Sequence, residues 1–425
     1  MPGLAKTTTA ETLSALRAII TEGILRQGSD ADAICGVVPE LFFEPTDVSE
    51  LSRVLEFSNR TGLLVAPRGS GTKLDWGIAP QSIDLMISTA KFNRILEHAP
   101  GDMTVTVEAG VTFSQLEDAL SLHRQRLALD PLWPDQATVG GVIASNDSGA
   151  LRVRYGSVRD LIIGITVLLS DGTLAKSGGK VVKNVAGYDL HKLMSGALGT
   201  LGVITSAVFR LHPMPAESRT LSFPFLAREK ANEFMLAITD SIVVPTGLQM
   251  RTGSNGKVVV DVRIDGITAG VAAQSDTVCK LAGNIHPADP DGDPWQARER
   301  LWSDSASATI FKLSMLPTQL STTAEFVREE LSENADWNMV MHSTGLVFLR
   351  VDATECEQVA EFTSSIRQFL APAGGTAVLL RAPSLVRQKV DVWGSAGSSL
   401  PLMRRIKEQF DPRGILNRGR YVGGI

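Results

Sequence analysis

The sequence has few cysteines and no long apolar run, and each absence excludes a class of site or protein. The three cysteines, Cys35, Cys279 and Cys356, lie far apart and form no CxxC pair, so local spacing offers neither an iron–sulfur nor a structural zinc site. No apolar run approaches the roughly 18 residues that a membrane span needs. The first residues also lack the basic start and unbroken apolar stretch of a signal peptide. These features predict a reduced, cytoplasmic protein.

An excess of charge and a histidine cluster are missing as well. The formal net charge is -5, with 41 basic and 46 acidic residues, which gives no reason to expect nucleic acid as a bulk electrostatic partner. The late histidines, His286 and His342, have no partner at ligand spacing, so no metal site is predicted. The 425 residues are 44% hydrophobic, enough for two or three domains with a sizeable core.

The first part of the chain has the pattern of an α/β unit. Residues 10–28 are amphipathic and predict a helix, and residues 41–67 predict strand, helix and strand. Thr46 or Asp47 is the expected cap of the second helix, and Gly62 is expected to end it. Downstream, residues 161–178 predict a β-hairpin that turns at Asp171-Gly172.

The third stretch of the chain contains a weak internal repeat. The segments NGKVVVDVRIDG (255–266) and TGLVFLRVDA (344–353) share a strand-like alternation. Each precedes a helical segment and then a strand with a basic residue, Lys312 in one case and Arg381 in the other. The repeated order strand–strand–helix–strand predicts two ferredoxin-like halves in one antiparallel sheet, with helices on one face.

A glycine-rich loop, PRGSGTK (67–73), follows the strand of the first unit. It matches neither the P-loop pattern nor the GxGxxG fingerprint. Gly69 and Gly71 can still adopt positive φ and turn consecutive N–H groups inward as an anion nest, with Arg68 and Lys73 supplying charge for a pyrophosphate. A plain surface turn is the alternative for this loop taken alone.

Two further segments favour the ligand-binding interpretation. Residues 133–160 are unusually rich in glycine and in short hydrogen-bonding side chains, and residues 183–205 add Gly196, Gly199 and Gly202 before a strand. Long loops of this composition are more often functional than idle. Three such segments in one domain predict a large ligand with phosphates and a flat polar ring.

The order PRGSGT, ATVGG, YGSVRDLIIGITVLLSDG, KNVAGYDLHKLM, GTLGVIT and FDPRGILNRGR resembles the vanillyl-alcohol-oxidase-type (PCMH-type) FAD-binding oxidoreductases, and within them the FAD-binding subunits of bacterial glycolate oxidases. The resemblance implies an α+β fold: a two-subdomain FAD-binding domain with an antiparallel, ferredoxin-like cap. The implied limits are 1–36 for an N-terminal helical extension, 37–215 for the FAD domain, 216–395 for the cap and 396–425 for a returning tail. The implied FAD-binding residues are Pro67, Arg68, Gly69, Ser70, Gly71, Thr72, Lys73, Pro134, Thr138, Gly140, Gly141, Ser145, Asn146, Ser148, Gly149, Gly156, Gly202, Val203 and Ile204.

The chain departs from the family pattern in three places. Thr72 stands where many relatives carry a histidine that bonds to the flavin, so we expect non-covalent FAD. The histidine-rich metal motif of self-sufficient relatives is absent, and Arg418 replaces the usual proline of the tail.

The resemblance implies oxidation of a small 2-hydroxy acid, glycolate or D-lactate, by hydride transfer to flavin. Lys312 and Arg381 are the candidates for binding the substrate carboxylate, with Arg263 and Arg350 as weaker ones, and no residue stands out as the base. The implied partners are a second flavoprotein subunit and an iron–sulfur subunit, through which the chain would contact a membrane. Two alternatives stay open: a self-sufficient flavin oxidase of another alcohol or lactone, and a non-catalytic assembly or electron-relay subunit.

Overall fold

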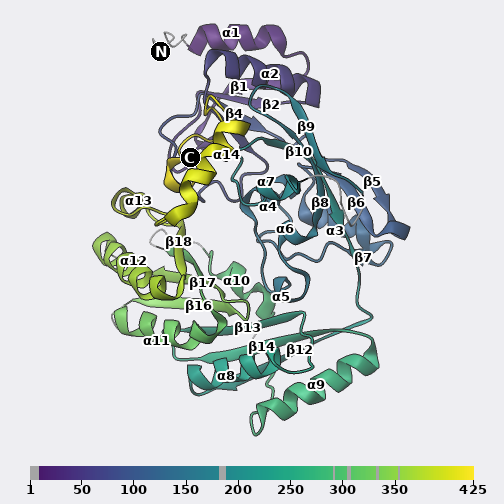
Figure 1. Cartoon of the computed structure of the whole chain (residues 1–425), viewed down its shortest axis with the longest axis vertical. Helices are drawn as coiled ribbons and strands as arrows, with labels where there is room; N and C mark the ends of the chain where they lie inside the picture. Colours follow the sequence, from purple (N-terminus) through teal and green to yellow (C-terminus); the bar gives the residue numbers. More distant parts are fainter. Residues whose placement is uncertain (1–8, 181–187, 291, 304–307, 332–334, 353–354) are drawn as a thin grey trace. The chain divides into compact units, whose positions relative to one another are not determined.

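The computed structural model describes residues 9–180, 188–290, 292–303, 308–331, 335–352 and 355–425 (Figure 1). Most of the KNVAGYDL motif falls in 181–187, outside the described residues. The chain divides into two compact units. Unit 1 comprises Met1–Asp147, Ser157–Pro213 and Ser395–Ile425, and unit 2 comprises Ser148–Gly156 and Met214–Gly394.

The first sheet of unit 1 has the strand order β1 (Ile24–Gln27), β2 (Leu41–Glu44), β4 (Leu85–Ser88), β3 (Val65–Arg68). Both β2 and β3 run parallel to β4, which lies between them. The helix α2 (Val48–Thr61) joins β2 to β3. As predicted, Asp47 caps it by accepting a hydrogen bond from the N–H of Glu50, and it ends at Gly62 with φ of 78°.

The predicted helix over 10–28 is wrong in its second half. The helix α1 (Thr9–Ile19) ends early, and residues 24–27 form β1 on the edge of the sheet. Three successive backbone N–H groups, those of Thr21, Glu22 and Gly23, donate to the Glu50 carboxylate. These hydrogen bonds to a buried carboxylate turn the chain at residues 21–23, where the amphipathic pattern alone predicts that the helix continues.

The second sheet of unit 1 is antiparallel, in the order β5 (Ile95–Ala99), β6 (Thr104–Glu108), β10 (Val203–Arg210), β8 (Ile162–Leu168), β9 (Leu174–Gly178). The hairpin of β8 and β9 turns at Gly172 with φ of 85°, as predicted. The unit also contains α3 (Phe113–Ser121), α4 (Val139–Ser145), α6 (Val158–Leu161), α7 (His191–Met194) and α14 (Leu400–Phe410), and the short strands β7 (Gln125–Arg126) and β11 (His212–Pro213).

Unit 2 contains one antiparallel sheet in the order β12 (Glu217–Phe225), β14 (Val258–Gly266), β13 (Gly247–Gly253), β16 (Asp336–His342), β17 (Leu346–Asp352), β15 (Thr309–Ser314), β18 (Thr376–Arg381). The helices α9 (Thr268–Ala282), α8 (Arg228–Thr239), α11 (Leu320–Glu330) and α12 (Cys356–Leu370) contact one another in this order. Figure 1 shows them along one side of the sheet. Three short helices, α5 (Arg152–Tyr155), α10 (Ala297–Arg300) and α13 (Ser384–Lys389), complete the unit.

The two predicted halves of this sheet are not equivalent. The second half, β15 to β18, has the full ferredoxin-like order β16-β17-β15-β18, whereas the first half has only β12, β14 and β13. The strand β15 starts the second half and does not close the first. Lys312 and Arg381 therefore do not occupy matching positions: they lie on neighbouring strands, with Arg381 opposite Ile310.

Within the described ranges, no helix is both long and apolar enough to cross a membrane.

Candidate cofactor site and a buried polar cluster

Unit 1 contains a cavity of about 700 Å³, open to solvent, around the glycine-rich loop. Fourteen residues predicted to bind the cofactor line it: Pro67, Arg68, Gly69, Ser70, Gly71, Thr72, Lys73, Thr138, Gly140, Gly141, Ser145, Gly202, Val203 and Ile204. Pro134 and Asn146 lie in unit 1 outside this lining. Ser148, Gly149 and Gly156 belong to unit 2.

The loop after β3 has the backbone that an anion nest requires. Gly71 has φ of 91°, a conformation that side chains other than glycine rarely adopt. A Cβ on Gly69 would lie 1.9 Å from Oγ1 of Thr138, so only glycine fits this close approach. The described residues contain no hydrogen bond from the N–H groups of Ser70, Gly71 or Thr72. These donors are therefore available to a ligand.

Both cations of this loop have carboxylate partners in unit 1. Arg68 Nη1 lies 3.3 Å from Oδ1 of Asp32, and Lys73 Nζ lies 3.2 Å from Oδ2 of Asp147. Both carboxylates are 1% exposed. Because each charge is already balanced, a phosphate here would gain less from Coulomb attraction than the sequence suggested and more from the backbone N–H groups.

The C-terminal tail supplies cavity residues that the sequence did not single out, Asn417 and Arg420. Arg420 donates to the carbonyl oxygens of Leu74 and Trp76, and Nδ2 of Asn417 donates to the carbonyl of Leu198 at 2.6 Å. The tail motif is visible in the sequence, but its contact with the loop joins residues more than 300 positions apart, which no local pattern shows. Thr89, Leu74, Ala144, Leu198 and Gly199 complete the lining.

The lining fits a large ligand with phosphates and polar ring edges. Three buried polar atoms at the cavity have no hydrogen-bond partner: Nε of Arg68, Oγ1 of Thr138 and Oδ1 of Asn417. Buried polar atoms without partners are costly, which indicates that a ligand provides the missing hydrogen bonds. A Cβ on Gly199 would approach Pro67 to 2.8 Å, so the backbone here comes close to its neighbours. These unpartnered donors and acceptors, together with the glycine backbone of the lining, fit FAD.

Unit 2 holds a buried polar cluster around His342, at the end of β16. His342 is 3% exposed, and neither ring nitrogen has a hydrogen-bond partner. Burial, reinforced by the charges of Arg298 and Arg152, lowers its pKa to about 3. The ring is therefore neutral and can accept a hydrogen bond, although a pKa this low makes it a weak base.

The surroundings of His342 are polar as well. Nη1 of Arg298 donates to the carbonyl of Ser148 at 3.1 Å, and its guanidinium lies 5.1 Å from the ring centroid of Phe348. The hydroxyls of Ser148 and Ser343 are buried and have no partner. Sequence reasoning missed this cluster because its members come from three separate segments of the chain.

The arginines and the lysine predicted to bind substrate lie elsewhere in unit 2. Arg381 donates to the carbonyl of Trp302 at 3.4 Å and stacks on its ring, and Lys312 is half-buried on the neighbouring strand. Arg350 makes a bidentate ion pair with Asp352. Arg263 stacks on Trp295 with 4.7 Å between guanidinium carbon and ring centroid.

No group of three or more histidine, cysteine, aspartate or glutamate residues in the described ranges could hold a metal ion.

Part of unit 1 matches a known family of cofactor-binding domains. Residues 39–178 match the family model described as an FAD binding domain. The chain is 27% identical to the "Glycolate oxidase subunit GlcD" of Bacillus subtilis, over 90% of this chain and 89% of that protein. It is 36% identical to a D-lactate dehydrogenase of Archaeoglobus fulgidus, over 44% of this chain and 42% of that protein.

Solved structures agree at the level of the fold. The 4-ethylphenol oxidase from Gulosibacter chungangensis aligns with a TM-score of 0.77 and 15% identity, over 99% of this chain and 98% of that one. The chain is therefore an FAD-dependent oxidoreductase, as its motifs predicted, and its fold is similar to that of the vanillyl-alcohol-oxidase (PCMH) type flavoenzymes.

Proposed function

We propose that this chain oxidises a small 2-hydroxy acid, glycolate or D-lactate, as the FAD-binding subunit of a glycolate oxidase or dehydrogenase complex. The observation that carries the proposal is the similarity to a glycolate oxidase subunit over 90% of the chain. A match to a D-lactate dehydrogenase supports the same substrate class. Residues 37–215 and 396–425 would form the FAD domain, and residues 216–395 the cap.

Bound FAD would accept a hydride from the C–H bond of the substrate. The N–H groups of Ser70, Gly71 and Thr72 would hold its pyrophosphate, and Thr138 and Asn417 would offer a hydroxyl and an amide oxygen to its polar edges. Thr72 has no ring nitrogen with which to attach a flavin, so we propose that FAD is held non-covalently. Acid precipitation should then release all of the flavin into the supernatant.

Unit 2 supplies groups suited to a hydroxy acid. A carboxylate needs a cation, and the hydroxyl needs an acceptor for its proton as the carbonyl forms. Arg298 and Arg152 carry charge near His342, which is neutral and has both nitrogens free. We propose these arginines as carboxylate ligands, alongside the sequence-based candidates Lys312 and Arg381. A bound carboxylate would offset the arginine charges and raise the pKa of His342, which we propose as the proton acceptor.

The partners are proposed from the word "subunit" in the name of the similar protein. A second flavoprotein subunit and an iron–sulfur subunit would pass the electrons onward. The cytoplasmic location expected from the sequence stays a prediction, with membrane contact through these partners.

The test is to purify the chain alone and add glycolate or D-lactate under anaerobic conditions while following flavin absorbance. Bleaching of the isolated chain would show that it has its own substrate site, which rules out the non-catalytic relay. Bleaching only after co-expression with the partner subunits would rule out a self-sufficient oxidase. Flavin that neither acid reduces in any combination would refute the proposed substrate class.

A further inference from the structure

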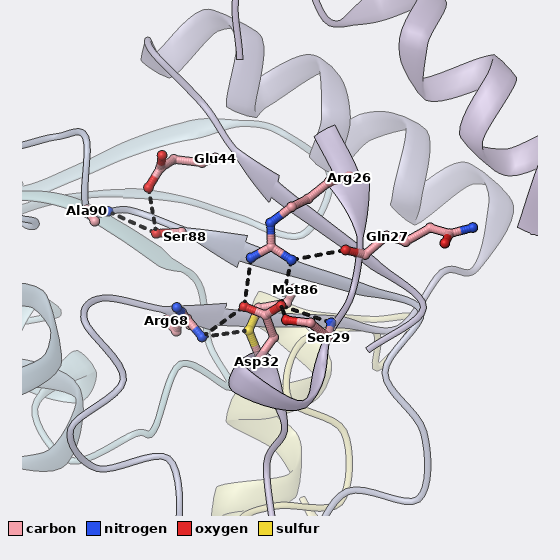
Figure 2. A network of polar contacts seen from close by, with 9 residues as sticks. All are labelled: Arg26, Gln27, Ser29, Asp32, Glu44, Arg68, Met86, Ser88 and Ala90. Carbon is pink, nitrogen blue, oxygen red and sulfur yellow. Dashed lines mark hydrogen bonds and ion pairs between the residues drawn. The ribbon is translucent and has the colours of Figure 1, made fainter. Parts of the chain in front are cut away.

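An ion-pair network joins the N-terminal segment of unit 1 to the cofactor loop (Figure 2). Asp32, 1% exposed, accepts hydrogen bonds from Nη1 and Nη2 of Arg26 at 2.6 and 2.9 Å. It also accepts from the backbone N–H and the hydroxyl of Ser29, at 3.0 and 2.7 Å. These bonds hold the carboxylate in one orientation and hold its pKa well below the ordinary value, so it stays ionised.

The same carboxylate contacts the cofactor loop through Arg68. Nη1 of Arg68 lies 3.3 Å from Oδ1 of Asp32 and 3.6 Å from Sδ of Met86. Arg26 and Arg68 share the ring of Phe42, at 3.9 and 5.2 Å from its centroid. Figure 2 shows Arg26 above the Asp32 carboxylate and Arg68 to its left, each joined to it by a dashed line. Without this carboxylate the two like charges would repel each other.

One buried nitrogen of Arg68 has no partner. Nε is buried and has no hydrogen-bond partner, although Arg68 lines the cavity and directly precedes Gly69. A guanidinium is a rigid planar fork, so the ion pair of Nη1 with Asp32 and its contact with Met86 together restrict the direction of the Nε–H bond. An unused buried donor at the wall of an FAD cavity is suited to an anionic oxygen of the ligand.

We propose that Asp32, held by Arg26, is a positioning residue of the cofactor site: it orients Arg68 so that Nε donates to a phosphate oxygen of FAD. Asp32 and Arg26 precede the region 39–178 that matches the family model, so that match assigns them no role. This role of Asp32 concerns cofactor binding and does not depend on which substrate the enzyme oxidises.

The negative charge of Asp32 has an effect on FAD binding opposite to that of its positioning of Arg68. The charge repels phosphate, so its removal alone would strengthen FAD binding. Positioning should dominate because Arg26 already neutralises Asp32 and because solvent in the open cavity screens the remaining charge. The two effects have opposite signs, so a binding measurement decides between them.

The experiment is a double-mutant cycle on the full chain after removal of its flavin, with the FAD dissociation constant as readout. Asp32→Asn and Arg68→Met should each weaken FAD binding by roughly tenfold or more, as expected for a hydrogen bond to a charged group. The double variant should bind FAD no more weakly than Arg68→Met alone. Asp30→Asn, in the same short 3-10 helix but exposed, is the control and should bind like the wild type.

FAD binding by Asp32→Asn that is as tight as in the wild type, or tighter, would overturn the proposal. Effects of the two substitutions on the FAD dissociation constant that multiply in the double variant would also overturn it. If Asp32→Asn does not fold, Arg68→Lys tests the same point, since it keeps the charge and leaves residues 24–32 intact but loses the fork. Undiminished FAD affinity in folded Arg68→Lys would also overturn it.

Discussion

The two units handle their buried polar groups in different ways. In unit 1 both cations of the cofactor loop are paired with buried carboxylates, Arg68 with Asp32 and Lys73 with Asp147. In unit 2, His342 is buried with both nitrogens free, and the charges nearest to it are positive. A paired charge needs no ligand to balance it, and unit 1 leaves single atoms such as Nε of Arg68 and Oγ1 of Thr138 without partners, whereas in unit 2 both nitrogens of a buried ring lack one. Unit 1 is thus suited to recognition by shape and by backbone hydrogen bonds, and the role proposed for unit 2 is to bind an anion and accept a proton.

The largest effect should come from filling the glycine loop of unit 1. Gly69→Val places branched carbon where Oγ1 of Thr138 lies, and Gly71→Val forces a β-branched residue to positive φ. Either variant should be purified without flavin, as judged by the ratio of flavin to protein absorbance. Gly101→Ala is the matched control, because a Cβ there meets nothing within 4 Å. A fully yellow Gly69→Val protein would show that the loop does not approach the cofactor.

The second-largest effect should come from a substitution in unit 2 that lowers activity and does not change FAD binding. His342→Leu removes the proposed proton acceptor and should lower kcat by roughly 100-fold or more, the range of general base catalysis. The melting temperature should stay the same or rise, because an unpaired polar ring is replaced by an apolar side chain. FAD content should not change. The exposed His286→Leu serves as control, and full activity in His342→Leu would remove His342 from the mechanism.

The pH dependence of stability should also separate the two units. The pKa of His342 falls from 6.5 to about 3 on folding, so the unfolded chain binds more protons between these values and stability is lost as pH falls. In unit 1, burial raises the pKa of Glu117 from 4.5 to about 7, so the folded chain binds more protons there and stability is lost as pH rises. Each slope is at most about 1.4 kcal/mol per pH unit.

Melting temperatures of the wild type, His342→Leu and Glu117→Gln across these ranges check both signs. His342→Leu should lose acid sensitivity, and Glu117→Gln should flatten the decline toward neutral pH. An unchanged pH profile in either variant would mean that the group titrates alike in the folded and unfolded chain.

The difference between the units also explains what the sequence could predict. The caps of α2, the turn at Gly172 and the loop of Gly69 and Gly71 depend on local backbone chemistry, which a short motif displays. The sharing of Asp32 between Arg26 and Arg68 depends on the turn that ends α1 early, where Glu50 competes with the helix. The His342 cluster depends on strand order, and a periodic pattern that suggested equal halves could not show which strand β15 would join.

The smallest predicted effect concerns a single hydroxyl of unit 1. Thr138 is at the N-cap position of α4, yet its side chain caps nothing, and its buried Oγ1 lines the cavity without a partner. Thr138→Val keeps the shape and removes only the hydroxyl, so the FAD dissociation constant should rise by roughly fivefold, the equivalent of one neutral hydrogen bond. Apoprotein stability should not fall. Thr112→Val is the opposite case, because Thr112 does cap α3 by accepting from Gln115. It should lower the melting temperature and leave FAD affinity unchanged, and equal FAD affinity in both variants would show that Thr138 is idle.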